Sequence, residues 1–247
     1  MPGQSPVALP DLFPLGQDGI LARFGDGFQA QPAAALAFGR AVRDADLPGV
    51  TEVATALAST LVRFAPQVVT RDALTDTLHR IAVMPRAGDV SAAGRLWTIP
   101  ASFGGESGPQ LSEAAQIAGM TPDAAIAQIS ATDLSVLAIG FAPGQPYLGH
   151  LPDRWDMPRQ TDLTPQVPAG ALVVALRQVV LFANPSPTGW RWIGTCALDP
   201  FRSDRADPFA LRAGDRVRFT PTDADTIARL RAGQTDGLGG ACCTVMS

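Results

Sequence analysis

Residues 140–149 read GFAPGQPYLG, and this stretch decides how the second half of the chain is interpreted. It holds three glycines, two prolines and the only tyrosine of the chain, and the short apolar run 134–139 leads into it. Glycine permits backbone conformations closed to other residues, whereas proline fixes φ and removes a hydrogen-bond donor. The stretch therefore predicts a rigid, shaped loop at the end of a buried strand. Such loops often carry binding sites, and a tight structural turn is the simpler alternative.

The residues on both sides of this loop predict a β-rich domain. Many short strands punctuated by glycine and proline are typical of a barrel or a sandwich. Short apolar runs of this kind recur at 96–99, 134–141, 171–176, 179–182, 190–193 and 216–219. Helices are predicted at about 111–118, 122–130 and 223–231, and residues 234–247, which are glycine-rich, are predicted to be a mobile tail.

The first part of the chain has a different pattern. Strands are predicted at 12–15, 20–24, 50–57 and 61–64, and helices at 32–44 and 71–82. Pro32 suits a first helical position, and Thr70 is suited to cap the second helix. This order is typical of an α+β layer with helices on one face. Because residues 84–94 lack any periodicity, we predict an N-terminal α+β domain over 1–88 and a mainly-β domain over 89–247.

The overall composition excludes several function classes. The chain has 247 residues, 46% of them apolar, and a formal net charge of -4, which gives no reason to expect nucleic acid or an anionic membrane surface as a partner. All 19 basic residues are arginine, so a phosphate-loop lysine, a Schiff-base lysine and a Ser-x-x-Lys nucleophile are excluded. No apolar run spans a membrane and no secretory signal is visible. Three cysteines and two histidines make a disulfide framework or a zinc site improbable, so a reduced, cytoplasmic protein is predicted.

Candidate reactive groups are few. His150 and Asp153 have a spacing that a divalent ion could use, but a solvated turn is the better interpretation. Cys196 follows an apolar strand and is better explained as a core residue than as a nucleophile. Ser186 lies in a turn sequence with no base nearby, so a serine hydrolase is unsupported. Tyr147 and His150 are close in sequence and either could transfer a proton.

Candidate anion-binding groups are more informative. The glycine-rich stretch 103–108, with Phe103, Gly104 and Gly105, could form an anion nest from backbone N–H groups, although a hairpin turn is the default. Arg159 and Arg177 could each clamp a carboxylate bidentately. Either arginine alone is more commonly a surface residue, because arginine supplies every positive side-chain charge in this chain.

Several short motifs in combination resemble one family. They are IP at 99–100, FGGExGP at 103–109, GFAPGxPYLG at 140–149, PR at 158–159, VPAG at 167–170, Gln178, SPxGW at 186–190, IG at 193–194 and LxxGDxVxF at 211–219, with PLGxD at 14–18 and RFGD at 23–26. The chain resembles, over about residues 8–225, the family called allophanate hydrolase subunit 1, KipI or the B subunit of 5-oxoprolinase (PxpB). The resemblance implies an N-terminal α+β domain followed by a cyclophilin-like β-barrel.

The same resemblance implies a function. It predicts a subunit of an ATP-dependent amide hydrolase complex, most simply a 5-oxoprolinase that opens 5-oxoproline to glutamate, or a related small-amide hydrolase or carboxyltransferase. The implied partners are a second KipA/PxpC-type subunit and a LamB/YcsF-type subunit, and ATP is used by the complex. Because the chain lacks lysine, a self-sufficient nucleotide site in it is disfavoured. The alternative is a KipI-like regulatory module that presents apolar loops to a histidine kinase.

The resemblance also implies where the substrate binds. Gln178, Tyr147 and Ser186 would hydrogen-bond the substrate, Arg159 would meet a carboxylate, and the 103–108 loop would contribute backbone donors. The implied substrate-binding set is Phe103, Gly104, Gly105, Phe141, Pro143, Gly144, Tyr147, His150, Arg159, Gln178, Ser186 and Trp190. No residue is assigned a catalytic role, since a general base can come from the partner.

The chain departs from the family pattern around this site. Relatives usually have Gly-Gly-Gln-Thr-Gly where residues 176–180 read LRQVV, so two bulky side chains are expected to intrude beside Gln178. Gln145, Phe103, Ile129 and His150 replace the usual aromatic, tyrosine, histidine and glycine. Together these differences predict either a different substrate or a pocket no longer used for catalysis.

Overall fold

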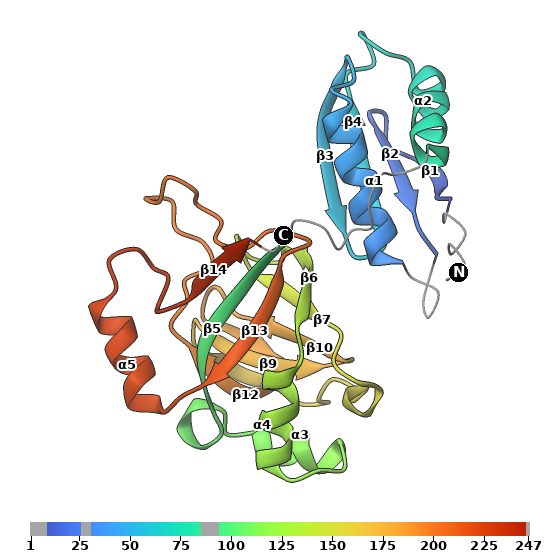
Figure 1. Cartoon of the computed structure of the whole chain (residues 1–247). Helices are drawn as coiled ribbons and strands as arrows, with labels where there is room; N and C mark the ends of the chain where they lie inside the picture. The colour runs from blue at the N-terminus through green and yellow to red at the C-terminus, as the bar shows by residue number, and fades with distance from the viewer. Residues whose placement is uncertain (1–8, 26–30, 85–93, 246–247) are drawn as a thin grey trace, which may run out of the picture. The chain divides into compact units, whose positions relative to one another are not determined.

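The structure, a computed structural model, describes residues 9–25, 31–84 and 94–245. The chain divides into two compact units, Met1–Ala92 and Ala93–Ser247, which Figure 1 shows. The domain boundary predicted between residues 88 and 89 lies outside the described residues.

The first unit is a four-stranded antiparallel sheet with two helices. The strands are β1 (Asp11–Leu15), β2 (Gly19–Arg23), β3 (Val50–Ala56) and β4 (Ser59–Phe64), in the order β1-β2-β4-β3, and the helices are α1 (Pro32–Asp44) and α2 (Arg71–Val83). Ile20 of β2 lies opposite Val62 of β4, and both contribute to the cluster that the apolar faces of α1 and α2 cover. The hydroxyl of Thr70 accepts a hydrogen bond from the backbone N–H of Ala73, as expected of a helix cap.

The second unit is built on a closed barrel of seven strands. They are β5 (Arg95–Phe103), β6 (Leu134–Ile139), β7 (Pro146–Gly149), β9 (Ala171–Ala175), β10 (Gln178–Leu181), β12 (Arg191–Cys196) and β13 (Arg216–Pro221). They follow the order β12-β9-β10-β7-β6-β13-β5, and β5 pairs back onto β12 to close the ring. Every pairing in the ring is antiparallel except that of β13 with β5. The predicted barrel is confirmed.

Shorter elements surround the barrel. Three helices are α3 (Leu111–Ile117), α4 (Pro122–Ala131) and α5 (Ala224–Gly233), and two 3-10 turns are Gly105–Ser107 and Asp153–Trp155. Strands β8 (Thr164–Val167) and β11 (Ser186–Thr188) form a separate two-stranded sheet. Among the described residues, the structure contains no helix with the length and apolar character needed to cross a membrane.

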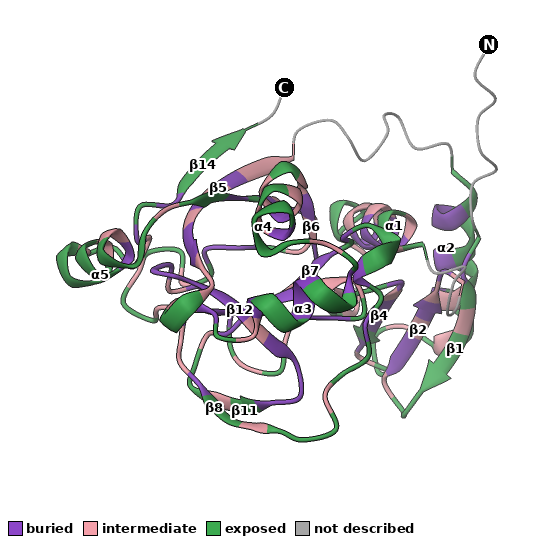
Figure 2. Ribbon diagram, turned by 90° about the horizontal axis from the view of Figure 1, so that it is seen from below, coloured by how far each residue is buried: buried purple, intermediate pink, exposed green. Residues whose placement is uncertain are grey.

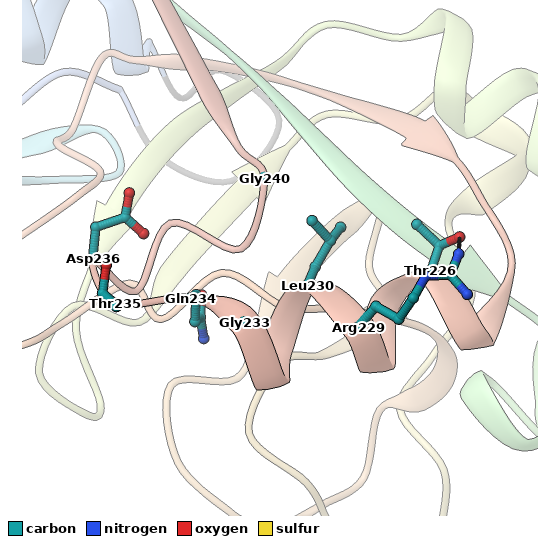
Figure 3. A pocket seen from close by; sticks show the side chains of 8 residues that line it. All are labelled: Thr226, Arg229, Leu230, Gly233, Gln234, Thr235, Asp236 and Gly240. Atoms are coloured by element: carbon teal, nitrogen blue, oxygen red, sulfur yellow. Dashed lines mark hydrogen bonds between the residues drawn. The ribbon is translucent and has the colours of Figure 1, made fainter.

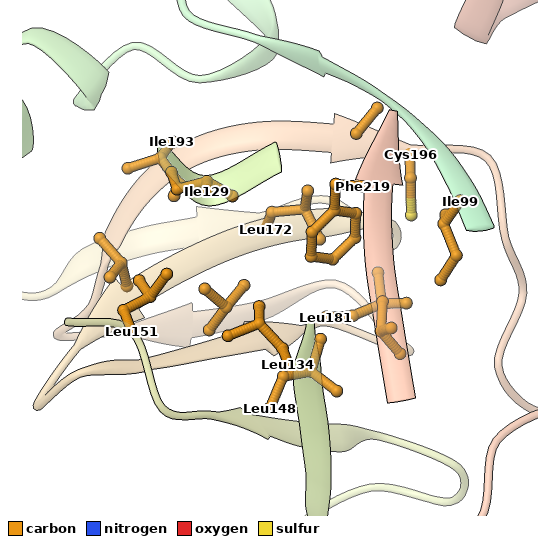
Figure 4. Packing of buried hydrophobic residues seen from close by; sticks show 14 of the residues in the cluster. Ile99, Ile129, Leu134, Leu148, Leu151, Leu172, Leu181, Ile193, Cys196 and Phe219 are labelled. Atoms are coloured by element: carbon orange, nitrogen blue, oxygen red, sulfur yellow. The ribbon is translucent and has the colours of Figure 1, made fainter. Parts of the chain in front are cut away.

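The interior of the barrel is filled with side chains. Figure 4 shows Leu148, Leu172, Leu181 and Phe219 pointing into one cluster, which Ile129 of α4 joins. Successive residues of a strand point to opposite faces, so the neighbours of these residues point to the outside of the barrel wall. Any ligand site must therefore lie on the outside or at a rim.

Two expectations from the sequence are wrong. Residues 234–247 contain a strand, β14 (Cys242–Val245), which pairs antiparallel with β5 and is exposed along its length (Figure 2). Gly239, at φ +55°, allows the chain just before β14 to pass close to Ala197. A Cβ at this position would lie 2.3 Å from the backbone carbonyl carbon of Ala197. The 140–149 loop is likewise shorter than expected, since Pro146–Gly149 forms β7.

Candidate functional site

A pocket of about 270 Å³ lies against the outer wall of the barrel. Its lining comes from β7, β10, the loop before β7, the segment between the second 3-10 turn and β8, and the turn that leads from β11 into β12. The lining residues are Phe141, Gln145, Tyr147, Arg159, Leu163, Val180, Phe182, Pro187, Thr188, Gly189 and Trp190. Four of the predicted site residues, Phe141, Tyr147, Arg159 and Trp190, are thus brought together.

The floor of the pocket is aromatic and apolar. Tyr147 and Val180 are directly opposite each other in the β7–β10 register, while their neighbours Leu148 and Val179 point into the barrel core. The Tyr147 and Trp190 rings pack edge to face with centroids 6.3 Å apart. These residues belong to a second apolar cluster on the outer wall, separate from the interior core. Such a floor suits the apolar face of a small ring.

Arg159 supplies the positive charge of the pocket. Its guanidinium lies 5.5 Å from the centre of the Trp190 ring, and no carboxylate among the described residues pairs with it. Its neighbours are tied to the wall, because the backbone N–H of Gln160 donates to the Gly189 carbonyl oxygen at 2.6 Å and Arg191 donates to the Pro158 carbonyl oxygen at 2.8 Å. An exposed guanidinium held in this way is suited to bind a carboxylate.

Phe141 and Leu163 form an apolar rim. Their exposed fractions are 78% and 65%, which is high for large apolar side chains. Phe141 adopts φ +72°, a conformation that residues other than glycine seldom take. The rim therefore exposes two large apolar side chains beside the pocket.

Other predicted residues support this site without lining it. Gly144, at φ +73°, packs so closely on the next loop that a Cβ would lie 2.6 Å from the Cβ of Phe201. Pro143 precedes it on the exposed part of the same loop. Ser186 belongs to β11, and its hydroxyl donates only a long hydrogen bond, 3.4 Å, to the Pro187 carbonyl oxygen.

Gln178 and His150 lie beyond the floor, at the end of β7. Gln178 is opposite Gly149 and points to the same outer face as Val180, two residues further along β10. His150 is exposed, and partial burial together with the nearby positive charge of Arg177 lowers the pKa of its imidazole. Neither residue contributes to the pocket lining.

The glycine-rich loop lies apart from the pocket. The backbone N–H of Gly104 donates to the Ile193 carbonyl oxygen at 3.2 Å, and Phe103 packs edge to face on Phe219. Gly105, the third predicted residue of this loop, begins the 3-10 turn. None of these three residues lines the pocket. The loop therefore serves to dock the chain on β12.

The residues at 176 and 177 also lie apart from the pocket. Leu176 and Arg177 have φ values of 51° and 61° and form the two-residue turn between β9 and β10. Arg177 directs its side chain to the Leu151 carbonyl oxygen at 2.9 Å and to the Asp153 carboxylate at 2.6 Å. Neither side chain intrudes into the pocket, and Val180 of the same stretch reaches its floor instead.

No metal site or reactive thiol accompanies the pocket in the part of the chain that the structure describes. The described residues contain no cluster of three or more potential metal ligands. Asp153, predicted as a possible partner of His150 in metal binding, is paired with Arg177. Cys196 is fully buried, and burial raises the pKa of its thiol to about 12. It is therefore a core residue, as the simpler interpretation of the sequence held.

A second hollow, of about 420 Å³, runs beside the end of α5 (Figure 3). Arg229, which lines it, donates a hydrogen bond to the hydroxyl of Thr226, and the other side chains around it include Leu230, Gln234 and Asp236. Among the described residues, its lining contains no aromatic side chain and none of the predicted site residues. Although it is larger, the wall pocket is the better candidate, because it combines aromatic side chains with Arg159.

The predicted site set missed seven members of the lining. They are Gln145, Leu163, Val180, Phe182, Pro187, Thr188 and Gly189. The signal for two of them was the alternation along β10, because Val180 lies two residues after Gln178 and Phe182 follows two residues later on the same face. Gln145 was noted only as a departure from the family pattern.

Comparison with known proteins places the chain in a class. Residues 10–211 match the family described as carboxyltransferase domain, subdomain C and D. Within that class, the chain is 32% identical over 220 residues to the B subunit of 5-oxoprolinase from Bacillus subtilis (strain 168), covering 83% of this chain and 90% of the relative. The chain therefore belongs to the family of 5-oxoprolinase B subunits, as its motifs predicted.

Two solved structures resemble this chain. The crystal structure of TTHA0988 is 31% identical with a TM-score of 0.70, and the match covers 83% of this chain but 40% of that one. The urea carboxylase of Kluyveromyces lactis has a TM-score of 0.76 at 15% identity, with 100% of this chain and 25% of that chain covered. The second likeness concerns the fold alone.

Proposed function

We propose that this chain is a subunit of an ATP-dependent amide hydrolase complex that opens 5-oxoproline to glutamate, with the wall pocket as its substrate site. The observation that carries the proposal is the guanidinium of Arg159, which lies over the ring of Trp190 and pairs with no carboxylate of the described residues. It lines a pocket in a chain related to the B subunits of 5-oxoprolinases. Related small amides that carry a carboxylate are the wider substrate class.

The pocket has the chemistry that such a substrate requires. Its volume of about 270 Å³ lies just below the range of roughly 300–1,000 Å³ common for drug-sized ligands, so it suits a smaller molecule. Arg159 would bind the carboxylate, and the rings of Tyr147 and Trp190 would contact the five-membered ring of the substrate. Gln178 lies beyond the floor, on the same outer face of the wall as Val180, and would hydrogen-bond the amide of the substrate.

Among the described residues, the pocket lining contains no histidine, cysteine or carboxylate that could act as a general base. His150 lies outside the lining, and the pKa of about 12 keeps the Cys196 thiol protonated. We therefore assign the general base and the ATP site to the partners, a KipA/PxpC-type subunit and a LamB/YcsF-type subunit in the same cytoplasmic complex. The exposed rim of Phe141 and Leu163 would be covered by one of them.

The test is ATP-dependent glutamate release from 5-oxoproline by the chain assembled with both partners, with the chain alone as the control. Arg159→Met should raise the KM for 5-oxoproline by roughly tenfold to a hundredfold, because a charge-assisted contact is lost. Arg154→Met removes an exposed arginine outside the pocket and should leave KM unchanged. Stable assembly without turnover, or an unchanged KM in Arg159→Met, would refute the proposal.

One observation favours a regulatory module as the second candidate. Phe141 projects from the rim with 78% of its surface exposed, as an aromatic anchor for another protein would. In that case the chain would neither assemble with the two partner subunits nor support turnover, and Phe141→Ala would weaken binding to a histidine kinase.

A further inference from the structure

Gln145 is a buried polar side chain for which the proposed function does not account. Only 1% of its surface is exposed, yet it lines the wall pocket together with Tyr147 and Arg159. Buried amides in folded proteins are nearly always hydrogen-bonded. The partners of this amide therefore indicate what the pocket holds.

The Ala183 N–H group shows which atom of the Gln145 side-chain amide is the oxygen. The backbone N–H of Ala183 points at the side-chain oxygen, 3.4 Å away, and an N–H group can donate only to the oxygen of an amide. The oxygen therefore faces Ala183 and the NH₂ group faces elsewhere. No acceptor among the described residues takes a hydrogen bond from that NH₂ group, so two donors remain for a ligand.

The backbone holds Gln145 in place. Its N–H donates to the Ala142 carbonyl oxygen at 3.1 Å, and its carbonyl oxygen accepts from the Gly140 N–H at 3.0 Å. Gly144, the preceding residue, is packed against Phe201. A donor fixed in this way is preorganised, because little conformational freedom is lost when a ligand binds.

We propose that Gln145 determines specificity by donating a hydrogen bond from its NH₂ group to the amide carbonyl oxygen of the ligand, while Arg159 binds the carboxylate. This role of Gln145 rests on the proposed function and narrows the class of ligands that the pocket accepts. The pocket accepts small carboxylic acids that carry an amide carbonyl, and it discriminates against acids of the same shape that lack that oxygen. A buried donor that loses its partner accounts for the discrimination.

Calorimetric titration of the full chain, alone and assembled, tests the proposal with two ligands. 5-Oxoproline has both groups, and cyclopentanecarboxylate has a ring of the same size and the carboxylate but no carbonyl oxygen. Wild type should bind 5-oxoproline roughly tenfold or more tightly than cyclopentanecarboxylate. Gln145→Met keeps the length of the side chain but has no donor, so it should bind both ligands equally.

Two further variants complete the design. Gln145→Glu keeps an oxygen for the Ala183 N–H but removes both donors, so it should also abolish the preference and weaken 5-oxoproline more than Gln145→Met does. Arg159→Met should weaken both ligands by a similar factor and keep the preference. Because the readout is a ratio of two affinities, a general loss of packing does not mimic the expected result.

The same titrations distinguish a failure of the Gln145 role from a failure of the proposed function. If wild type binds 5-oxoproline and Gln145→Met keeps a tenfold preference for it, the role of Gln145 is refuted and the proposed function stands. If wild type, alone and assembled, does not bind 5-oxoproline, the proposed function fails and the role of Gln145 fails with it.

Discussion

Replacing Gly108 by alanine should weaken the barrel strongly, because the turn at residues 105–108 presses directly on β12. A Cβ at position 108 would lie 2.1 Å from both the carbonyl carbon and the oxygen of Ile193, and 2.5 Å from the Gly194 nitrogen. All three atoms are backbone, so no side-chain rotation relieves the contact. The turn must move away from β12 by more than about 1 Å to restore ordinary contact distances.

The magnitude follows from the hydrogen bonds that hold the turn. Gly104 and Gln110 each donate a backbone hydrogen bond to β12, at 3.2 and 2.9 Å, and the Thr195 hydroxyl donates to the Ser107 carbonyl oxygen at 2.7 Å. Each contributes a net stabilisation of about 1 kcal/mol. Displacing the turn should therefore lower the free energy of unfolding by about 3 kcal/mol.

Tryptophan fluorescence during urea unfolding is the assay. All four tryptophans lie in the Ala93–Ser247 unit, so the signal reports on the barrel and not on the first unit. Gly108→Ala should shift the midpoint downward by about 1–2 M urea. The matched control is Gly140→Ala, where a Cβ meets nothing within 4 Å, and it should stay within about 0.5 kcal/mol of wild type. Equal midpoints for the two variants would refute the packing argument.

Three further predictions concern the core and the titrating groups. Cys196 should resist alkylation in the native chain because burial raises its pKa to about 12, while the two exposed cysteines of β14 react; mass spectrometry showing three modified native thiols would contradict this. The lowered pKa of His150, caused by burial and then by Arg177, means that the unfolded chain binds the proton more readily. Wild type should therefore lose stability relative to His150→Asn as the pH falls below about 6.5, and parallel thermal-melting profiles would contradict the assignment. Leu148→Ala removes a fully buried side chain from the barrel and should cost about 3–5 kcal/mol in urea unfolding; a loss under about 1 kcal/mol would show that the interior is not tightly packed.

The helices and most strands were predictable because their signals are local. Thr121 precedes Pro122 in the sequence, and the structure shows its hydroxyl accepting from the Ala124 N–H at the start of α4. Strand β14 was not predictable in this way, because it has no alternation and is exposed throughout. It forms through pairing with β5, where Cys242 lies opposite Thr98, and such a distant partner leaves no local pattern.

The pocket was only partly predictable, because its lining also depends on contacts between residues that are distant in the sequence. The motif residues Phe141, Tyr147, Arg159 and Trp190 indicated a site, and the structure brings them together. The rest of the floor was harder to predict. Val179, Val180 and Leu181 of β10 are all buried, so an apolar run alone cannot tell the core face from the pocket face. Only the strand register decides which residues reach the pocket.

That register gives β10 and the residue after it, Phe182, two roles on which natural selection can act separately. Val179 and Leu181 belong to the interior, whereas Val180 and Phe182 face the pocket. Exchanges at the first pair alter how well the barrel holds together, whereas exchanges at the second alter the wall pocket alone. Under the proposed function, a lineage can therefore acquire a new ligand through alternate codons of one short segment, without first having to survive a weakened core.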